Sequence, residues 1–246
     1  MDLFTTIGLS FVFLAAAFLY ASVGHAGASG YLTAMALFGM PPASMRPIAL
    51  VLNILVATIA SFKFYQSGAF SWRLLIPFAL TSVPFAFIDG TITLPGNMYK
   101  IVLGLILLYA AYRMLMSAKG SFSQAVHPLP FVPALIAGAV IGLLSGLIGT
   151  GGGIFLTPLL LFSGWSQPRQ ASGVSAVFIL VNSTAGLVGQ SPTLTLLPAA
   201  MPLWLAVVAI GGWVGAEYGS KHWNSTQLRR ALAFVMVIAA SKLILT

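Results

Sequence analysis

The sequence predicts an all-α integral membrane protein built as a tandem repeat, and three observations point to that class. Of the 246 residues, 59% are hydrophobic and 6% are charged, and the mean hydropathy is +1.01. Three long stretches, 3–45, 120–168 and 170–216, contain no Asp, Glu, Lys or Arg. The two halves of the chain also resemble each other. Because a soluble domain carries roughly a quarter charged residues, this chain is expected to contact lipid.

The first half is expected to contain long apolar segments near 3–23, 47–66, 72–89 and 98–118, with a shorter one near 30–40. A helix needs about 20 residues to span the hydrocarbon core of a bilayer. The charge-free stretch 3–45 must therefore hold more than one membrane segment, and its glycines divide it. The short segment cannot span, and its length is typical of a broken or re-entrant half-helix.

The second half repeats this order. Its long segments are expected near 131–149, 171–190, 196–216 and 229–246, and its short one near 153–164. The whole chain is thus predicted to have eight long transmembrane helices and two half-helices. Each half-helix follows a glycine-rich break.

The repeat is visible as paired residues at nearly constant spacing. Lys100 pairs with Arg229 and Gly90 with Gly219 at an offset of 129, and Pro42 pairs with Pro168 at an offset of 126. We predict a first repeat over 1–120 and a second over 121–246, forming one membrane domain. Counting positive charges on each side favours five elements per half, and therefore halves of inverted orientation with both termini outside.

The densest motif is Gly149-Thr150-Gly151-Gly152-Gly153. Four glycines in five positions cannot sustain a helix interior, since each costs up to ~1 kcal/mol relative to alanine. The motif predicts a bare loop leading into the N-terminus of a short helix, where unpaired N–H groups can bind an anion. Gly142, Gly146 and Gly149 also have the spacing of close helix packing, so we assign those three mainly to packing.

The first half has a looser version of this loop around His25, Gly27, Ser29 and Gly30. We expect the two breaks to face each other and to hold one small anion between them. Histidine is suited to sensing or carrying a proton, although a lone histidine in a break can equally cap a helix. The arginines Arg46 and Arg169 follow the short segments, where they can attract or gate an anion or reach the lipid headgroups.

Polar side chains inside the apolar segments complete the predicted binding site. Asn53 and Asn182 lie within spans, where an amide needs a hydrogen-bond partner. Ser175 precedes Asn182 in the same segment, and such hydroxyls either line a polar path or bond their own backbone. The substrate-binding set is Gly27, Ser29, Gly30, Asn53, Thr150, Gly151, Gly152, Gly153, Ser175 and Asn182.

The distribution of charge excludes several functions. The three acids are Asp2, Asp89 and Glu217, and none lies at the centre of a predicted span, where carriers of cations place a carboxylate. The chain has no cysteine, and its basic residues form no patch dense enough for nucleic acid. We expect no enzyme activity, catalytic residue, metal or cofactor. A secretory signal would begin with basic residues, and here the first charged side chain is Asp2.

The stretch from Gly146 to Pro158, followed by Gly164, Pro168 and 171–175, resembles the repeat signature of the TauE/SafE family of sulfite-exporter-like permeases. The resemblance covers nearly the whole chain. It implies a multi-pass transporter of the bacterial inner membrane that moves sulfur-containing anions such as sulfite, sulfoacetate or another organosulfonate. Arg46-Pro47-Ile48 departs from the pattern, since the second half has Ser172-Gly173-Val174 at the equivalent place.

The sequence therefore predicts a transporter of small anions that works by alternating access in a lipid bilayer. An anion channel and a transporter of small carboxylates remain alternatives. The sequence leaves open the substrate, the direction of transport, the coupling ion and whether the protein forms a homo-oligomer.

Overall fold

The computed structural model describes residues 3–90, 126–190 and 197–224, with isolated positions at 108, 111, 112 and between 226 and 241. Throughout these ranges the regular structure is helical, and none of the described residues forms a strand. The predicted segment 98–118 falls almost wholly outside the described residues, and of the predicted segment 229–246 only isolated positions are described. The all-α class predicted from the composition is confirmed for the part of the chain that the structure describes.

The first half contains four described helices, α1 (Leu3–Ala21), α2 (Ala28–Leu37), α3 (Pro42–Gln66) and α4 (Trp72–Gly90). Helix α3 begins five residues earlier than the apolar pattern indicates. It starts on Pro42, because the fixed φ of proline suits the first helical position, where no N–H is needed.

The second half contains α6 (Phe131–Ile148), α7 (Gly153–Phe162), α8 (Pro168–Gly189) and α9 (Met201–Glu217), which continues into a π-helical turn, η2 (Tyr218–His222). Helix α8 likewise starts on a proline, Pro168. Helix α9 starts five residues later than the predicted segment.

Among the described residues, four helices are long and apolar enough to cross a membrane, within Leu3–Ala21, Ser44–Gln66, Pro168–Gly189 and Met201–His222. The apolar parts of α4 and α6 are shorter, Trp72–Ile88 and Phe131–Gly146. Helices α2 and α7 have 10 residues each, a length of about 15 Å against a hydrocarbon core of about 30 Å. The chain is a multi-pass membrane protein. Of the eight predicted long spans, these four meet both requirements within the described residues.

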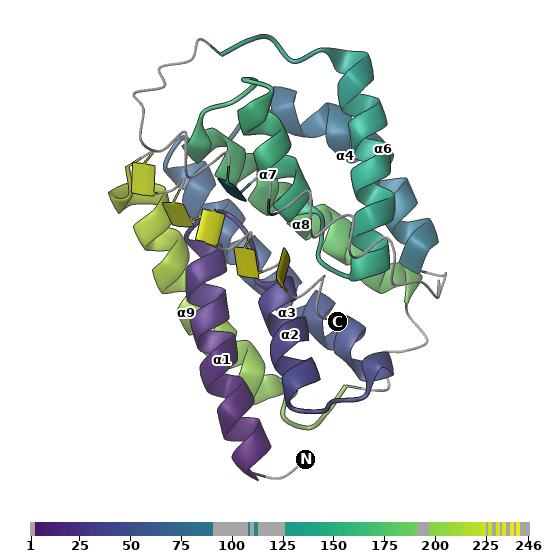
Figure 1. The fold of residues 1–246 in the computed structure, drawn as a ribbon, viewed down its shortest axis with the longest axis vertical. Coiled ribbons are helices and arrows are strands. Elements are labelled where there is room, and N and C mark those ends of the chain that lie inside the picture. The colour runs from purple at the N-terminus through teal and green to yellow at the C-terminus, as the bar shows by residue number, and fades with distance from the viewer. Residues whose placement is uncertain are drawn as a thin grey trace.

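The long helices pack mainly across the two halves of the chain. Helix α1 lies beside α9, and α4 lies beside α6, with α3 and α8 between these pairs (Figure 1). Glycines allow the close approach. Gly211 and Gly215 of α9 face the backbone of Leu14 and Phe18 in α1, so these two helices run parallel.

Helices α4 and α6 also run parallel. Gly138 and Gly142 of α6 face the backbone of Phe78 and Ser82 in α4. The spacing that predicted close packing at Gly142 therefore matches an observed helix contact, because a residue without a side chain lets two helix backbones approach.

Helices α3 and α8 run antiparallel. At one end, Gly173 in the second turn of α8 packs against Phe64 and Ala69 at the end of α3. At the other end, the guanidinium of Arg46 near the start of α3 lies against the side-chain amide of Gln190 at the end of α8. Two segments that are far apart in the sequence thus form the centre of the molecule.

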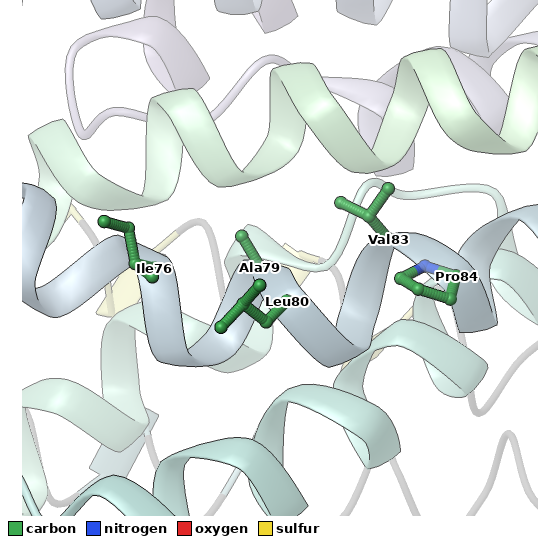
Figure 2. Close-up of a pocket in the computed structure, with 5 residues that line it drawn as sticks. All are labelled: Ile76, Ala79, Leu80, Val83 and Pro84. Atoms are coloured by element: carbon green, nitrogen blue, oxygen red, sulfur yellow. The ribbon is translucent and has the colours of Figure 1, made fainter.

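Large apolar side chains on the outside of the helices mark the surface that faces lipid. On α1, Phe4 and Phe11 are exposed, whereas Phe13 on the opposite face is fully buried against Tyr31 and Trp204. The outer face of α4 carries an open groove of about 380 Å³ lined by Ile76, Ala79, Leu80, Val83 and Pro84 (Figure 2). Because these lining side chains are all apolar, the groove offers no group to hold an anion.

Candidate functional site

The two glycine breaks precede the short helices, and both adopt backbone conformations that favour glycine. In the first break, Gly24 and Gly27 have φ values of 75° and 102°. In the second, Gly149, Gly151 and Gly152 have φ values of 72°, 74° and 78°. An L-residue with a side chain rarely adopts such angles. The breaks are therefore fixed by the sequence, and each ends directly before a helix N-terminus.

Asn53 in the middle of α3 connects the two breaks. Its Oδ1 accepts a hydrogen bond from the backbone N–H of Ala28 at 3.0 Å, at the start of α2. Its Nδ2 lies 3.4 Å from the carbonyl oxygen of Thr150 and 3.2 Å from Oγ of Ser183 on α8. The side chain is fully buried. One amide thus fixes the position of both breaks relative to α3 and α8.

The corresponding amide in the second half behaves differently. Asn182 follows Asn53 by 129 positions, three more than the offset of 126 between the prolines that begin α3 and α8. Its Nδ2 donates to the carbonyl oxygen of Phe178, one turn earlier in the same helix, at 2.8 Å, and its Oδ1 has no partner. Helix α7 therefore lacks the amide cap that Asn53 gives to α2.

The second break consequently leaves hydrogen-bond donors available. Among the described contacts, the backbone N–H groups of Gly151, Gly152 and Ile154 make no hydrogen bond. The hydroxyl of Thr150, a residue only 6% exposed, also has no partner. Buried donors are normally satisfied, so this cluster at the N-terminus of α7 is suited to an anion.

A chain of side-chain hydrogen bonds joins the first break to the second half. Nε2 of His25 lies 2.9 Å from Oγ1 of Thr157 on α7, and that oxygen lies 2.7 Å from Oγ of Ser175 on α8. All three residues are buried. A Cβ built on Gly153 would lie 3.4 Å from the His25 ring, so the start of α7 passes directly beside the imidazole.

Two predicted binding residues serve other contacts. Ser29 donates its hydroxyl hydrogen to the phenol oxygen of Tyr20 at 2.7 Å. Gly30 packs against Ala16 of α1, because a Cβ there would come within 2.9 Å of the Ala16 methyl group. Both residues hold α2 against α1.

The two predicted gating arginines differ in their relation to the breaks. The side chain of Arg46 lies beside Gly149 of the second break, where a Cβ would come within 3.0 Å of the Arg46 Cγ. Arg46 donates to the carbonyl oxygen of Gly146 near the end of α6, in addition to its contact with Gln190. A cation at this position compensates the negative end of the α6 dipole. Arg169 is half-buried in the first turn of α8, and the described contacts include no bond from it to either break.

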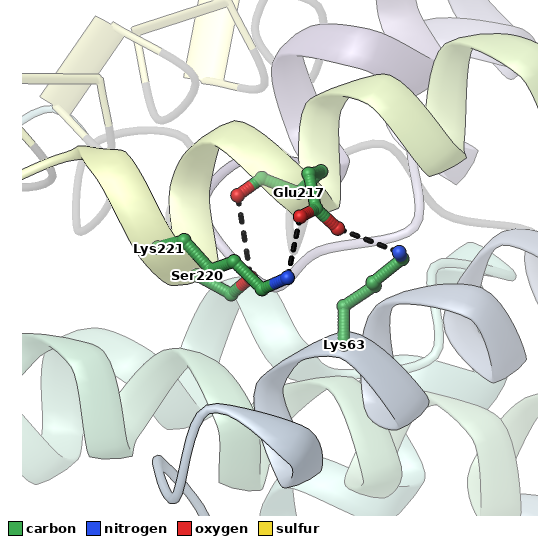
Figure 3. A network of polar contacts seen from close by, with 4 residues as sticks. All are labelled: Lys63, Glu217, Ser220 and Lys221. Atoms are coloured by element: carbon green, nitrogen blue, oxygen red, sulfur yellow. Dashed lines mark hydrogen bonds and ion pairs between the residues drawn. The ribbon is translucent and has the colours of Figure 1, made fainter.

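A second polar cluster, formed by Lys63, Glu217 and Lys221, joins the halves near the end of α3 (Figure 3). Nζ of Lys63 lies 2.6 Å from one carboxylate oxygen of Glu217, and Nζ of Lys221 lies 2.6 Å from the other. Lys63 is 6% exposed and also lies 3.7 Å from the centre of the Trp213 ring. These charges sit at helix ends.

Sequence reasoning missed Thr157 and the pairing of Lys63 with Glu217. Thr157 is four positions after Gly153 and so lies on the same face of α7, which is a signal that was present in the sequence. The ion pair gives no such signal, because its partners are separated by more than 150 positions and meet only after packing.

Several membrane-crossing helices around a buried polar centre, with two broken helices meeting there, define the class of membrane transporters. The chain belongs to the sulfite exporter TauE/SafE family, whose model matches residues 9–243. This assignment agrees with the resemblance inferred from the glycine motif, and the family comprises membrane transporters and not enzymes.

Individual relatives support the assignment. The chain is 43% identical over 242 residues, 97% of its length and 98% of the relative's, to a "probable membrane transporter protein y4hK" of Sinorhizobium fredii. A "probable membrane transporter protein" of Xylella fastidiosa is 33% identical over 84 residues, 34% of this chain and 32% of that one. No solved structure matches the chain significantly.

Proposed function

We propose that this protein transports a small sulfur-containing anion, such as sulfite, sulfoacetate or another organosulfonate, across the bacterial inner membrane. The anion binds at the second glycine break, where the donors of Thr150, Gly151 and Gly152 come from consecutive residues. The observation that carries this proposal is the set of buried donors without partners at the start of α7. In a membrane interior, such groups require protein, water or substrate as partners.

The asymmetry between the breaks refines the site. Asn53 occupies the N–H of Ala28 in the first break, whereas no side chain caps the start of α7 and the hydroxyl of Thr150 adds a donor there. The first half contributes His25 and Asn53, which contact the second half from the opposite side. The anion is held mainly by the second repeat and is enclosed by the first.

The antiparallel packing of α3 and α8 supports an inverted repeat. These helices occupy equivalent places in the two halves, so an antiparallel arrangement corresponds to halves of opposite orientation. In the repeat, α1 corresponds to α6 and α4 corresponds to α9. The contact of α1 with α9 therefore has its equivalent in the contact of α6 with α4. Movement of one repeat (1–120) against the other (121–246) around the breaks provides alternating access.

Binding of anions to purified protein tests the site. The substitution Thr150→Val removes the hydroxyl and keeps nearly the same side-chain shape. A hydrogen bond to a charged group contributes about 1.5–3 kcal/mol, so affinity for the bound anion should fall by roughly tenfold or more. The matched control is Thr184→Val, because Thr184 is exposed on α8 and bonds its own backbone. The panel consists of sulfite, sulfate, sulfoacetate and acetate.

Three results would contradict parts of the proposal. Unchanged anion affinity in Thr150→Val would exclude the second break as the site. A clear preference for acetate would overturn the sulfur assignment and leave the architecture intact. Anion flux into proteoliposomes that does not saturate with concentration would indicate a channel in place of a carrier.

A further inference from the structure

His25 is the feature of the polar centre that anion binding by backbone donors does not use. The residue is 1% exposed, and it lies in the first break between α1 and α2. One ring nitrogen, Nε2, contacts Thr157 at 2.9 Å. The other, Nδ1, is buried and has no hydrogen-bond partner. An ionisable ring with one free nitrogen thus faces the region where the two halves meet.

We propose that His25 is a proton-binding site and that the protein carries one proton together with each anion. This inference rests on the proposed function, because it concerns the ion that accompanies the transported anion. It assigns the coupling to the imidazole of the first break, joined to Thr157 and Ser175 of the second half.

The chemistry of the ring supports this role. In a protonated imidazole both nitrogens donate, so Nε2–H can remain on the Thr157 hydroxyl while Nδ1–H is available to an anion. Thr157 can then donate its own hydrogen to Ser175, 2.7 Å away, and the chain of hydrogen bonds stays complete. Protonation therefore adds one positive charge and one donor without breaking a contact that the structure contains.

Among the described residues, the hydrogen bonds of the ring include no charged side chain. The described helices near the ring are α1, α2, α3, α7 and α8, and their titratable or charged side chains are Tyr20, Tyr31, Arg46, Lys63, Tyr65 and Arg169. The phenol of Tyr20 accepts a hydrogen bond from Ser29, and the phenol of Tyr31 donates one to the carbonyl oxygen of Ala26. Phenols are neutral near pH 7. The three cations and Tyr65 lie near helix ends.

Because the site is buried, binding of the proton and binding of the anion depend on each other. A buried charge is costly unless it is paired, which applies to the protonated ring without an anion and to the anion without a proton. When both are present, each compensates the other. Linkage then requires that the proton raises anion affinity by the same factor as the anion raises proton affinity.

The experiment measures sulfoacetate binding to purified protein at about pH 6 and about pH 8, a range that brackets the ordinary pKa of histidine. Affinity of the unaltered protein should rise as the pH falls, by up to about tenfold per pH unit for one coupled proton. In His25→Gln the affinity should be nearly independent of pH. His127→Gln is the control, because His127 is exposed at the start of the second half, and it should retain the full pH dependence.

A measurement on the unaltered protein provides a test that does not depend on variant folding. Adding sulfoacetate to weakly buffered protein should take up about one proton per anion bound near neutral pH, detected with a pH indicator dye. Anion binding without proton uptake would overturn the proposal, and so would a His25→Gln variant that keeps its pH dependence. Failure of the unaltered protein to bind any anion of the panel would instead contradict the proposed function.

Thr157 distinguishes coupling from a merely structural role of the histidine. Thr157→Val removes the contact that positions the ring, and it should reduce the pH dependence while anion binding at about pH 8 persists. Thr157→Ser keeps the hydroxyl and should restore the dependence. Equal pH dependence in both variants would show that the hydrogen-bonded chain does not contribute to proton binding.

Discussion

At the scale of single residues, one buried amide joins the segments at the centre of the protein. Asn53 is fully buried and contacts both glycine breaks and α8. The sequence shows only that an amide inside an apolar segment needs partners. Which partners it finds depends on segments that lie 25, 97 and 130 positions away.

Replacing Asn53 with leucine should destabilise the protein. Asn53→Leu leaves the N–H of Ala28 and the carbonyl of Thr150 without their side-chain partner, and each buried polar group left unpaired costs about 1–3 kcal/mol. We expect a clear fall in the midpoint of thermal unfolding of the purified protein in detergent. Thr58→Val on the same helix is the control, because Thr58 is exposed and bonds its own backbone. Equal midpoints for the two variants would contradict the bridging role of Asn53.

At the scale of helices, glycines serve two separate purposes. At the breaks, positive φ values end one helix and begin another. Within α6 and α9, glycines with helical backbone allow neighbouring helices to approach. The sequence predicts the first purpose from the density of glycines at 149–153, and it indicates the second from their spacing. It does not identify the helix that each glycine contacts.

The contact between α9 and α1 can be tested with a single methyl group. A Cβ on Gly215 would overlap the carbonyl group of Phe18, and overpacking of a tight contact typically costs about 1–3 kcal/mol. Gly215→Ala should therefore lower the free energy of unfolding. Gly186→Ala on α8 is the matched control. The nearest atom to its Cβ would be 3.8 Å away, so that variant should be neutral or gain up to about 1 kcal/mol from helix propensity. A Gly215→Ala variant as stable as Gly186→Ala would argue against this helix contact.

At the scale of the whole molecule, the two halves are held together by helices that pair across the repeat. The antiparallel α3 and α8 form the centre, and the cluster of Lys63, Glu217 and Lys221 joins α3 to the end of α9 (Figure 3). Arg46 connects the other end of α3 to Gly146 of α6. Both ends of α3 thus bind the second half, and the glycine breaks lie between them.

Inverted halves place equivalent positions on opposite sides of the membrane. Pro41 and Gln167 are exposed, differ by the repeat offset of 126, and immediately precede α3 and α8. The chain contains no cysteine, so Pro41→Cys and Gln167→Cys each introduce a single thiol. In intact cells, a maleimide that cannot cross the membrane should label one variant and not the other. Labelling of both in permeabilised cells is the control, and labelling of both in intact cells would contradict the inverted arrangement.

The sequence alone determined that this protein lies in a lipid bilayer and where its helices break. Those properties are local, because composition decides whether a segment is stable in lipid, and glycine and proline decide where a helix begins or ends. The short helices at 28–37 and 153–162, the positive φ values of the breaks and the membership of the transporter family could therefore be anticipated.

Only the tertiary structure decided which polar groups meet. It brought His25 to Thr157, Asn53 to Ser183 and Lys63 to Glu217, and it placed Arg46 beside Gly149 of the second break. It also made the two breaks unequal, because Asn53 caps α2 while Asn182 bonds its own helix. The physical reason is that the contacts of His25, Asn53 and Lys63 with the second half join segments more than a hundred positions apart. Their geometry follows from how closely packed helices cross and not from any local preference of the chain.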